Sequence, residues 1–215
     1  WVAGLHTRGK PYPADAKNIT TFTAGRFAPR GSDLAEVTQG LEATEPAGLP
    51  TVTPLRPFMP PQSGCPTGLL ITDEDCRVED FNLAALDICT TATLAASSLR
   101  SPLPVSDLVT WFEAGALADA AMRVGASPVV LQVADPTSLV KWAMTAGVTQ
   151  IATPYITRGP LRDWLDQAAP SLTANGITFC EWRRDWDTAV WPYATAGFFK
   201  VRQNIPRILE LALPA

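Results

Sequence analysis

The sequence predicts a three-layer α/β domain of the Rossmann-like class with about five parallel strands, preceded by a short loop-and-helix segment and a proline-rich linker. Three observations predict it. From residue 67 onward, short apolar runs alternate with longer stretches whose apolar residues recur at helical spacing. Glycine, proline and aspartate mark the junctions. Strands that alternate with long helices need crossover connections, which give a parallel sheet with helices on both faces.

Five apolar runs have the length and composition of buried strands. The first, Gly68 to Thr72, leads into the acidic loop Asp73-Glu74-Asp75. The second spans residues 88–95, and the other three span residues 128–134, 150–156 and 177–182. These runs are expected to form the five strands of the sheet.

The first long helix is expected between Ser106, which has the side chain of an N-cap, and Gly125, which ends it. Apolar residues recur within it at helical spacing. They are Leu108, Trp111, Phe112 and Ala116.

Two further helices have clear boundaries. Asp135-Pro136 opens the first and Gly147 ends it, whereas Gly159-Pro160 opens the second and Asn175-Gly176 closes it. The side chains expected to face inward are Leu139, Trp142, Ala143 and Ala146 in the first helix, and Leu161, Trp164, Leu165, Ala168 and Leu172 in the second.

Residues 46–66 contain seven prolines, which exclude a regular helix or a central strand and favour a semi-extended linker. Its apolar residues Val52, Leu55, Phe58 and Met59 suggest that it lies on a protein surface. The linker separates residues 1–45, where a short helix is expected near 32–41, from the α/β domain at 67–215. The domain ends in an aromatic-rich tail from Trp186 to Leu213, which is expected to pack and to include a final helix. Pro206 interrupts the apolar pattern of Ile205, Ile208 and Leu209.

Charge is divided unevenly along the chain. Residues 1–30 carry five basic side chains against Asp15 alone, a balance of +4, whereas the remainder has 12 basic and 20 acidic residues, a balance of −8. The basic segment could contact phosphate, contact the negative surface of its own missing domain, or remain a solvated loop. The acidic remainder argues against a DNA-binding surface on residues 31–215 alone.

Several site types are excluded by missing motifs. No G-x-G-x-x-G follows the first strand, no Walker-type loop and no G-x-S-x-G elbow occur, and the only histidine, His6, lies outside the α/β domain. Cys65, Cys76, Cys89 and Cys180 form no C-x-x-C pair, so we expect reduced, mostly buried thiols and no metal. No apolar run approaches about 18 residues, and no signal pattern is present, so a cytoplasmic protein without a membrane span is expected.

The first thirty residues resemble the end of the FAD-binding domain of the DNA photolyase and cryptochrome superfamily. The resemblance rests on Trp1-Val2-Ala3-Gly4, Gly9-Lys10-Pro11-Tyr12-Pro13-Ala14 and Gly25-Arg26-Phe27-Ala28-Pro29. It implies a larger flavoprotein that holds FAD upstream of Trp1 and acts on DNA. Trp1 would line the lesion pocket and stack on a flipped pyrimidine pair, or would be an ordinary internal helix residue. Arg8 and Lys10 would face DNA, with Lys10 on phosphate.

The α/β part is similar to the antenna domain of the same superfamily. Residues 70–80 loosely resemble the D-L-R-x-x-D-N loop that follows the family's first strand and precedes a helix, and Asp135-Pro136 and Gly176-Ile177 follow the family's order. Here the α/β domain comes after the flavin domain's tail, as in a photolyase-related bacterial group with reversed modules. One photolyase branch carries an iron–sulfur cluster, but residues 20–30 contain no cysteine, so none is predicted.

Three functions remain open. The resemblance implies a light-dependent pyrimidine-dimer lyase or blue-light sensor, with the α/β domain as an accessory module that is inactive alone. Alternatively, the domain binds a nucleotide or second chromophore at the carboxyl ends of the strands, with Asp73, Asp135, Thr153, Tyr155 and Arg158 as lining residues. The third is a purely structural domain whose sheet crevice is filled by side chains. No catalytic residue is assigned. Arg183-Arg184 after the fifth strand could meet an anion or pair with Asp185 and Asp187.

Overall fold

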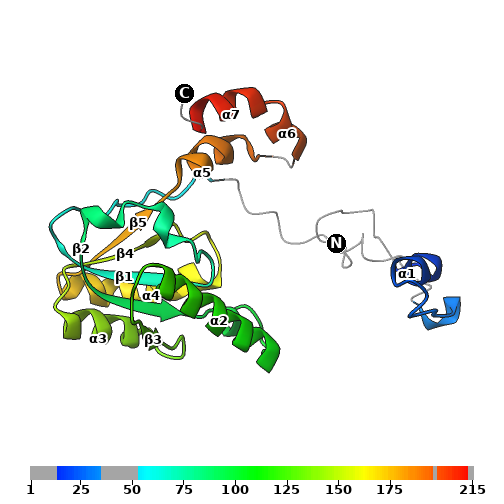
Figure 1. The fold of residues 1–215 in the computed structure, drawn as a ribbon, viewed down its shortest axis with the longest axis horizontal. Coiled ribbons are helices and arrows are strands. Elements are labelled where there is room, and N and C mark those ends of the chain that lie inside the picture. Colours follow the sequence, from blue (N-terminus) through cyan, green and yellow to red (C-terminus); the bar gives the residue numbers. More distant parts are fainter. Residues whose placement is uncertain (1–13, 35–52, 196–197, 213–215) are drawn as a thin grey trace. The chain divides into compact units, whose positions relative to one another are not determined.

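The computed structural model describes residues 14–34, 53–195 and 198–212 (Figure 1). The chain divides into two compact units, Trp1–Leu55 and Arg56–Ala215, each described here by itself. In the first unit, helix α1 (Ala16–Phe22) starts at Asp15, whose carboxylate accepts a hydrogen bond from the Asn18 backbone N–H at 2.8 Å. Trp1, Arg8, Lys10 and most of the helix predicted near 32–41 lie outside the described residues.

The second unit contains a five-stranded, all-parallel sheet, as predicted. Its strands are β1 (Pro66–Thr72), β2 (Asp87–Leu94), β3 (Val129–Leu131), β4 (Gln150–Pro154) and β5 (Thr178–Trp182). Their order is β3-β2-β1-β4-β5, with β1 at the centre. From β1 the chain first builds the sheet on one side, through β2 and β3, and then crosses to the other side of β1 to form β4 and β5. The topological switch point therefore lies between β1 and β4. β3 is shorter than the predicted run at 128–134.

Helices cover both faces of the sheet (Figure 1). Helices α3 (Thr137–Ala146) and α4 (Pro160–Ala174) pack on one face around Leu70, Leu94 and Ile151. Helix α2 (Asp107–Arg123) packs on the other face against Leu69 and Ile71. The domain is therefore a three-layer α/β domain of the Rossmann-like class.

The ends of α3 and α4 follow the predicted signals. Gly147 ends α3 in the left-handed conformation at φ 68°, which glycine adopts without strain. Pro160 opens α4, and the five inward-facing residues predicted for this helix are all buried. In α3, Leu139, Trp142 and Ala143 are buried as predicted.

Three of the four apolar residues that indicated α2 do not face the sheet. Leu108, Trp111 and Phe112 are 75%, 72% and 77% exposed, whereas the buried residues are Glu113, Leu117, Ala120 and Ala121. Only the second half of α2 lies on the sheet, and one end of the helix extends beyond it (Figure 1). The early apolar residues therefore sit on a free part of the helix.

No α-helix links β1 to β2. Residues 73–86, all of them described, contain two single 3-10 turns, Val78–Asp80 and Leu83–Ala85. Val78 is fully buried against Leu69 and Ile71, so this loop covers part of the face that α2 leaves open.

Residues 56–62 of the linker and the start of the tail contact the domain. Residues 53–65 contain no helix or strand, and Pro66 stands at the first position of β1, where a strand tolerates proline. After β5 come α5 (Asp185–Val190), α6 (Phe198–Arg202) and α7 (Ile205–Ala212). α7 is the predicted final helix, and Pro206 lies in its first turn, where a helix tolerates proline. α7 packs on α5, with Ile208 buried.

Candidate functional site

Ligands of open parallel sheets bind beyond the carboxyl ends of the strands, next to the switch point. In this domain that position lies where β1 runs into Asp73 and Glu74 and β4 runs into Tyr155, Ile156 and Thr157. Side chains from four loops meet here, and each of them is bonded to another part of the domain.

The first group closes the gap between the ends of β1, β2 and β4. Asp73 Oδ1 accepts the Ala96 N–H at 2.9 Å, and its Oδ2 lies 2.8 Å from Arg100 Nη1 without the alignment of a hydrogen bond. Glu74 accepts from Arg100 Nη2 at 3.5 Å and from the Thr157 hydroxyl at 3.4 Å. Arg100 and Glu74 therefore bridge the loops that flank the switch point.

The second group is built on Glu181, the fourth residue of β5, which is only 2% exposed. Its two carboxylate oxygens accept from Arg56 Nη1 and Nη2 at 2.6 and 2.7 Å. Oε1 also accepts the Ile156 N–H at 3.0 Å and lies 3.7 Å from Arg162 Nη1. Burial by itself would lower the pKa of Arg56, but the hydrogen bonds to Glu181 raise it above its ordinary value.

The third group is an aromatic cluster around Tyr155. Phe58 from the linker and Trp191 from the tail lie 5.7 and 5.4 Å from its ring. The Arg183 guanidinium lies over all three rings, at 5.0 to 5.8 Å from their centroids, and Arg56 lies over Tyr155 at 4.6 Å. These cation–π contacts tie the linker and the tail to the end of β4.

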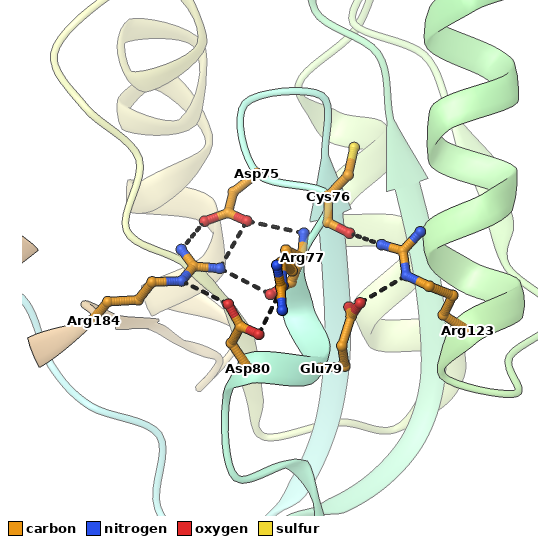
Figure 2. Close-up of polar contacts among 7 residues, drawn as sticks. All are labelled: Asp75, Cys76, Arg77, Glu79, Asp80, Arg123 and Arg184. Atoms are coloured by element: carbon orange, nitrogen blue, oxygen red, sulfur yellow. Dashed lines mark hydrogen bonds and ion pairs between the residues drawn. The ribbon is translucent and has the colours of Figure 1, made fainter. Parts of the chain in front are cut away.

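Two arginines hold the loop after β1 from opposite sides (Figure 2). Arg184 binds both oxygens of Asp75, donates to Asp80 at 3.1 Å and donates to the Arg77 carbonyl at 2.8 Å. From α2, Arg123 donates to Glu79 at 2.7 Å and to the Cys76 carbonyl. Arg184 thus pairs with Asp75 and Asp80 rather than with Asp185 and Asp187.

The charges of this loop shift each other's pKa values. The hydrogen bonds to Asp75 raise the pKa of Arg184. Arg123 lowers the pKa of Glu79, and desolvation at Asp80 is outweighed by the hydrogen bonds from Arg184 and Arg77, which lower its pKa. The stability that these carboxylates add is therefore complete above their ordinary pKa and is lost as the pH falls through the lowered values.

Replacing Arg184 by alanine is expected to loosen residues 73–81. Three acceptors lose their donor, but the guanidinium is 26% exposed, so we expect a loss of about 1–2 kcal/mol in global stability. Amide hydrogen exchange at pH 7 should rise at least about tenfold in this loop. Arg77→Ala, which removes a 74% exposed partner of Asp80, is the matched control and should leave exchange almost unchanged. Equal exchange in both variants would contradict the role given to Arg184.

The other residues predicted to line a ligand site are not brought together. Asp135 accepts the N–H and hydroxyl of Thr137 at the start of α3, and these hydrogen bonds lower its pKa. Thr153 is fully buried, and its hydroxyl has no partner among the described residues. Tyr155 belongs to the aromatic cluster, and Arg158 is exposed.

An open recess of about 500 Å³ does lie near the carboxyl ends, but on the β3 side of the domain. None of the five predicted residues lines it; its walls are Leu99, Val133, Ala134, Pro136, Pro160, Asp163, Trp164 and Gln167. Trp164 donates to the Val133 carbonyl at 2.8 Å, which fixes one wall. The recess is thus separate from the residues that meet at the switch point.

The four cysteines are free thiols, and their burial differs from the prediction. Cys180 is buried, Cys65 and Cys76 are half-buried, and Cys89 is exposed. In the described ranges, no three His, Cys, Asp or Glu side chains gather as metal ligands would. Cys65 and Cys180 line one cavity of about 200 Å³ at the amino ends of β4 and β5.

Cys180 is expected to resist alkylation in the folded protein. Burial raises the pKa of its thiol to about 11, so at pH 8 about one molecule in a thousand is a thiolate. Iodoacetamide should label the exposed Cys89 first and Cys180 at least about 100-fold more slowly, as followed by peptide mass spectrometry. In denaturant the difference should vanish. Labelling of Cys180 as fast as Cys89 in the native state would contradict the burial of this thiol.

Sequence reasoning missed Glu181, Arg56 and Arg162 as the buried charged centre of this edge. One signal was available: a glutamate stands between Cys180 and Trp182 in an otherwise apolar strand, and a buried carboxylate requires a partner. Its partner Arg56 is 125 positions away in the chain, so spacing gave no indication of it.

Comparison with models of known protein families and with curated proteins finds no match to this sequence. Among the residues that the structure describes, no helix combines the length and apolarity needed to cross a bilayer. The class of protein defined by the structure is therefore that of its fold, a Rossmann-like α/β domain.

Proposed function

We propose that the α/β domain is a non-catalytic accessory module of a larger, cytoplasmic photolyase- or cryptochrome-like flavoprotein. FAD is held by a domain upstream of Trp1, where the excited reduced flavin supplies the electron for pyrimidine-dimer repair or for blue-light signalling. The accessory module stabilises that protein through the proline-rich linker and the aromatic tail. By itself the chain repairs no DNA.

The observation that carries the accessory role is the junction after β1. In dinucleotide-binding domains, a glycine-rich loop and a helix N-terminus at this junction bind the pyrophosphate. Here β1 is followed by Asp73, Glu74 and Asp75 and then by 3-10 turns. The carboxylates of Asp73, Glu74 and Asp75 are already paired with Arg100 and Arg184. Residues 73–86 also supply no α-helix N-terminus to attract a phosphate. The residues at this edge therefore do not fit a nucleotide cofactor.

The linker contacts support the same role. Arg56 binds Glu181 through two hydrogen bonds, and the Met59 carbonyl accepts the Glu181 N–H at 2.8 Å beside β5. Gln62 exchanges hydrogen bonds with the Gln150 side chain at 3.0 and 2.7 Å. Residues 56–62 are thus fixed to the α/β domain, as expected of a domain that anchors the linker leading to it.

The flavoprotein part of the proposal rests on the motifs around Trp1, Lys10 and Arg26. It is tested by purifying the full-length gene product beside the 215-residue chain and measuring bound flavin by absorbance. The proposal predicts about one FAD per full-length molecule and none on the chain alone. Stoichiometric FAD on the isolated chain, or a flavin-free full-length protein, would contradict it.

A further inference from the structure

Helix α2 carries two apolar faces. Leu117, Ala120 and Ala121 lie against the sheet. On the side roughly opposite, helical spacing aligns Leu108, Trp111, Phe112, Gly115 and Met122, which we call the outer stripe. Its four large members are 70–77% exposed. The part of the chain that the structure describes places nothing over them.

The two ends of the outer stripe lie at equal distances from Gly115. Leu108 lies seven residues before Gly115, and Met122 lies seven residues after it. A Cβ added to Gly115 would meet nothing within 4 Å, so no contact inside the described domain requires glycine here. Glycine in a helix interior costs roughly 0.5–1 kcal/mol of stability relative to alanine. Contacts within one copy of the chain therefore do not explain why glycine stands at this exposed position.

We propose that the outer stripe is the contact between two copies of this chain, with their α2 helices antiparallel and Gly115 on the two-fold axis. In this arrangement Leu108 of one copy meets Met122 of the other, and Phe112 and Trp111 flank the axis. The glycines let the helices approach closely at their crossing point. This contact is isologous, as two-fold dimers require.

The helix dipoles of α2 fit an antiparallel pair, because the N-terminus of each helix then lies beside the C-terminus of the other. Asp119 lies along the side of the outer stripe, but Arg123 already pairs with it. Its charge is therefore compensated before association.

The area is sufficient for a weak dimer. An aromatic side chain buries about 150–250 Å², so Trp111 and Phe112 together expose roughly 300 Å². With Leu108 and Met122 the stripe reaches roughly 500–600 Å² per copy, or about 1,000–1,200 Å² per pair, near the lower bound for a specific interface. A dissociation constant in the micromolar range is expected.

Sedimentation equilibrium of the 215-residue chain from about 1 to 200 μM tests the proposal. We expect a reversible monomer–dimer equilibrium. Phe112→Glu and Gly115→Leu should each raise the Kd by at least about 30-fold, because both act at the centre of the contact. Met144→Glu, which places the same charge at a 54% exposed apolar position on α3, should leave the Kd unchanged.

Circular dichroism at low concentration should show that all three variants remain folded, since their side chains lie on the surface. A covalent test is independent of affinity: with diamide as oxidant, Gly115→Cys should form a disulfide-linked dimer well above the wild-type background. Ala114→Cys, whose side chain points away from the stripe, should not. A chain that stays monomeric at 200 μM, or a dimer that persists unchanged in Phe112→Glu and Gly115→Leu, would overturn the proposal.

Discussion

Replacing Glu181 by alanine is expected to destabilise the α/β domain by about 3–5 kcal/mol, because it removes the buried carboxylate that neutralises Arg56. Arg162, only 8% exposed, would keep Asp166 as its counter-ion, but the buried Ile156 N–H would lose its acceptor. Arg56 would lose both of its hydrogen bonds to Glu181, whereas the backbone contact of Met59 and the contacts of Gln62 would remain. The linker should therefore loosen around Arg56.

Urea unfolding followed by tryptophan fluorescence measures the loss of stability, and limited proteolysis near Arg56 measures loosening of the linker. Asp166→Ala is the matched control, because it removes another carboxylate bound to Arg162 but one that is 60% exposed. The control should cost less than about 1 kcal/mol. Equal losses in the two variants would show that Glu181 does not act as a buried charged centre.

Gly68→Ala is expected to cost about 1–3 kcal/mol, although alanine is the smallest possible addition. Gly68 lies in β1 at the centre of the sheet, and a Cβ there would lie 2.6 Å from Trp142 Cη2. The indole has little freedom to move, because it is buried and donates a hydrogen bond to Thr90 at 3.3 Å.

A double-mutant cycle identifies the cause. If the indole is the obstacle, Gly68→Ala should cost much less in a Trp142→Leu background, with a coupling energy of at least about 1 kcal/mol. Gly115→Ala, measured at about 1 μM, is the control, because open space surrounds that position and alanine should stabilise the helix slightly. A Gly68→Ala protein as stable as the wild type would refute the close packing of β1 on Trp142.

Local signals predicted most of the fold. The glycine, proline and aspartate residues at the ends of α3 and α4 fix the backbone conformation within a few residues. The apolar residues of α4 lie on a single face of the helix, so the buried face could be predicted from their spacing. The strand runs could be placed because their apolar residues are consecutive, as expected for strands buried on both faces.

The inward face of α2 could not be predicted in the same way. Apolar residues occupy two sides of this helix, so periodicity does not distinguish the side that meets the sheet from the outer stripe. The candidate site was predicted less well because its contacts join distant parts of the chain. Glu181 meets Arg56 and Arg184 meets Asp75 across more than 100 positions, and no local pattern encodes such pairs.

Side chains of the domain itself occupy the edge next to the switch point, where a Rossmann-like domain would bind a cofactor. The most direct test is an amide NMR titration of the 215-residue chain with FAD, FMN, a reduced folate, NAD and ATP. We predict no saturable shift changes at residues 73–75, 96–100 and 156–159 at millimolar ligand. Saturable changes concentrated at these residues with any one of the ligands would contradict the claim and assign the domain a cofactor of its own.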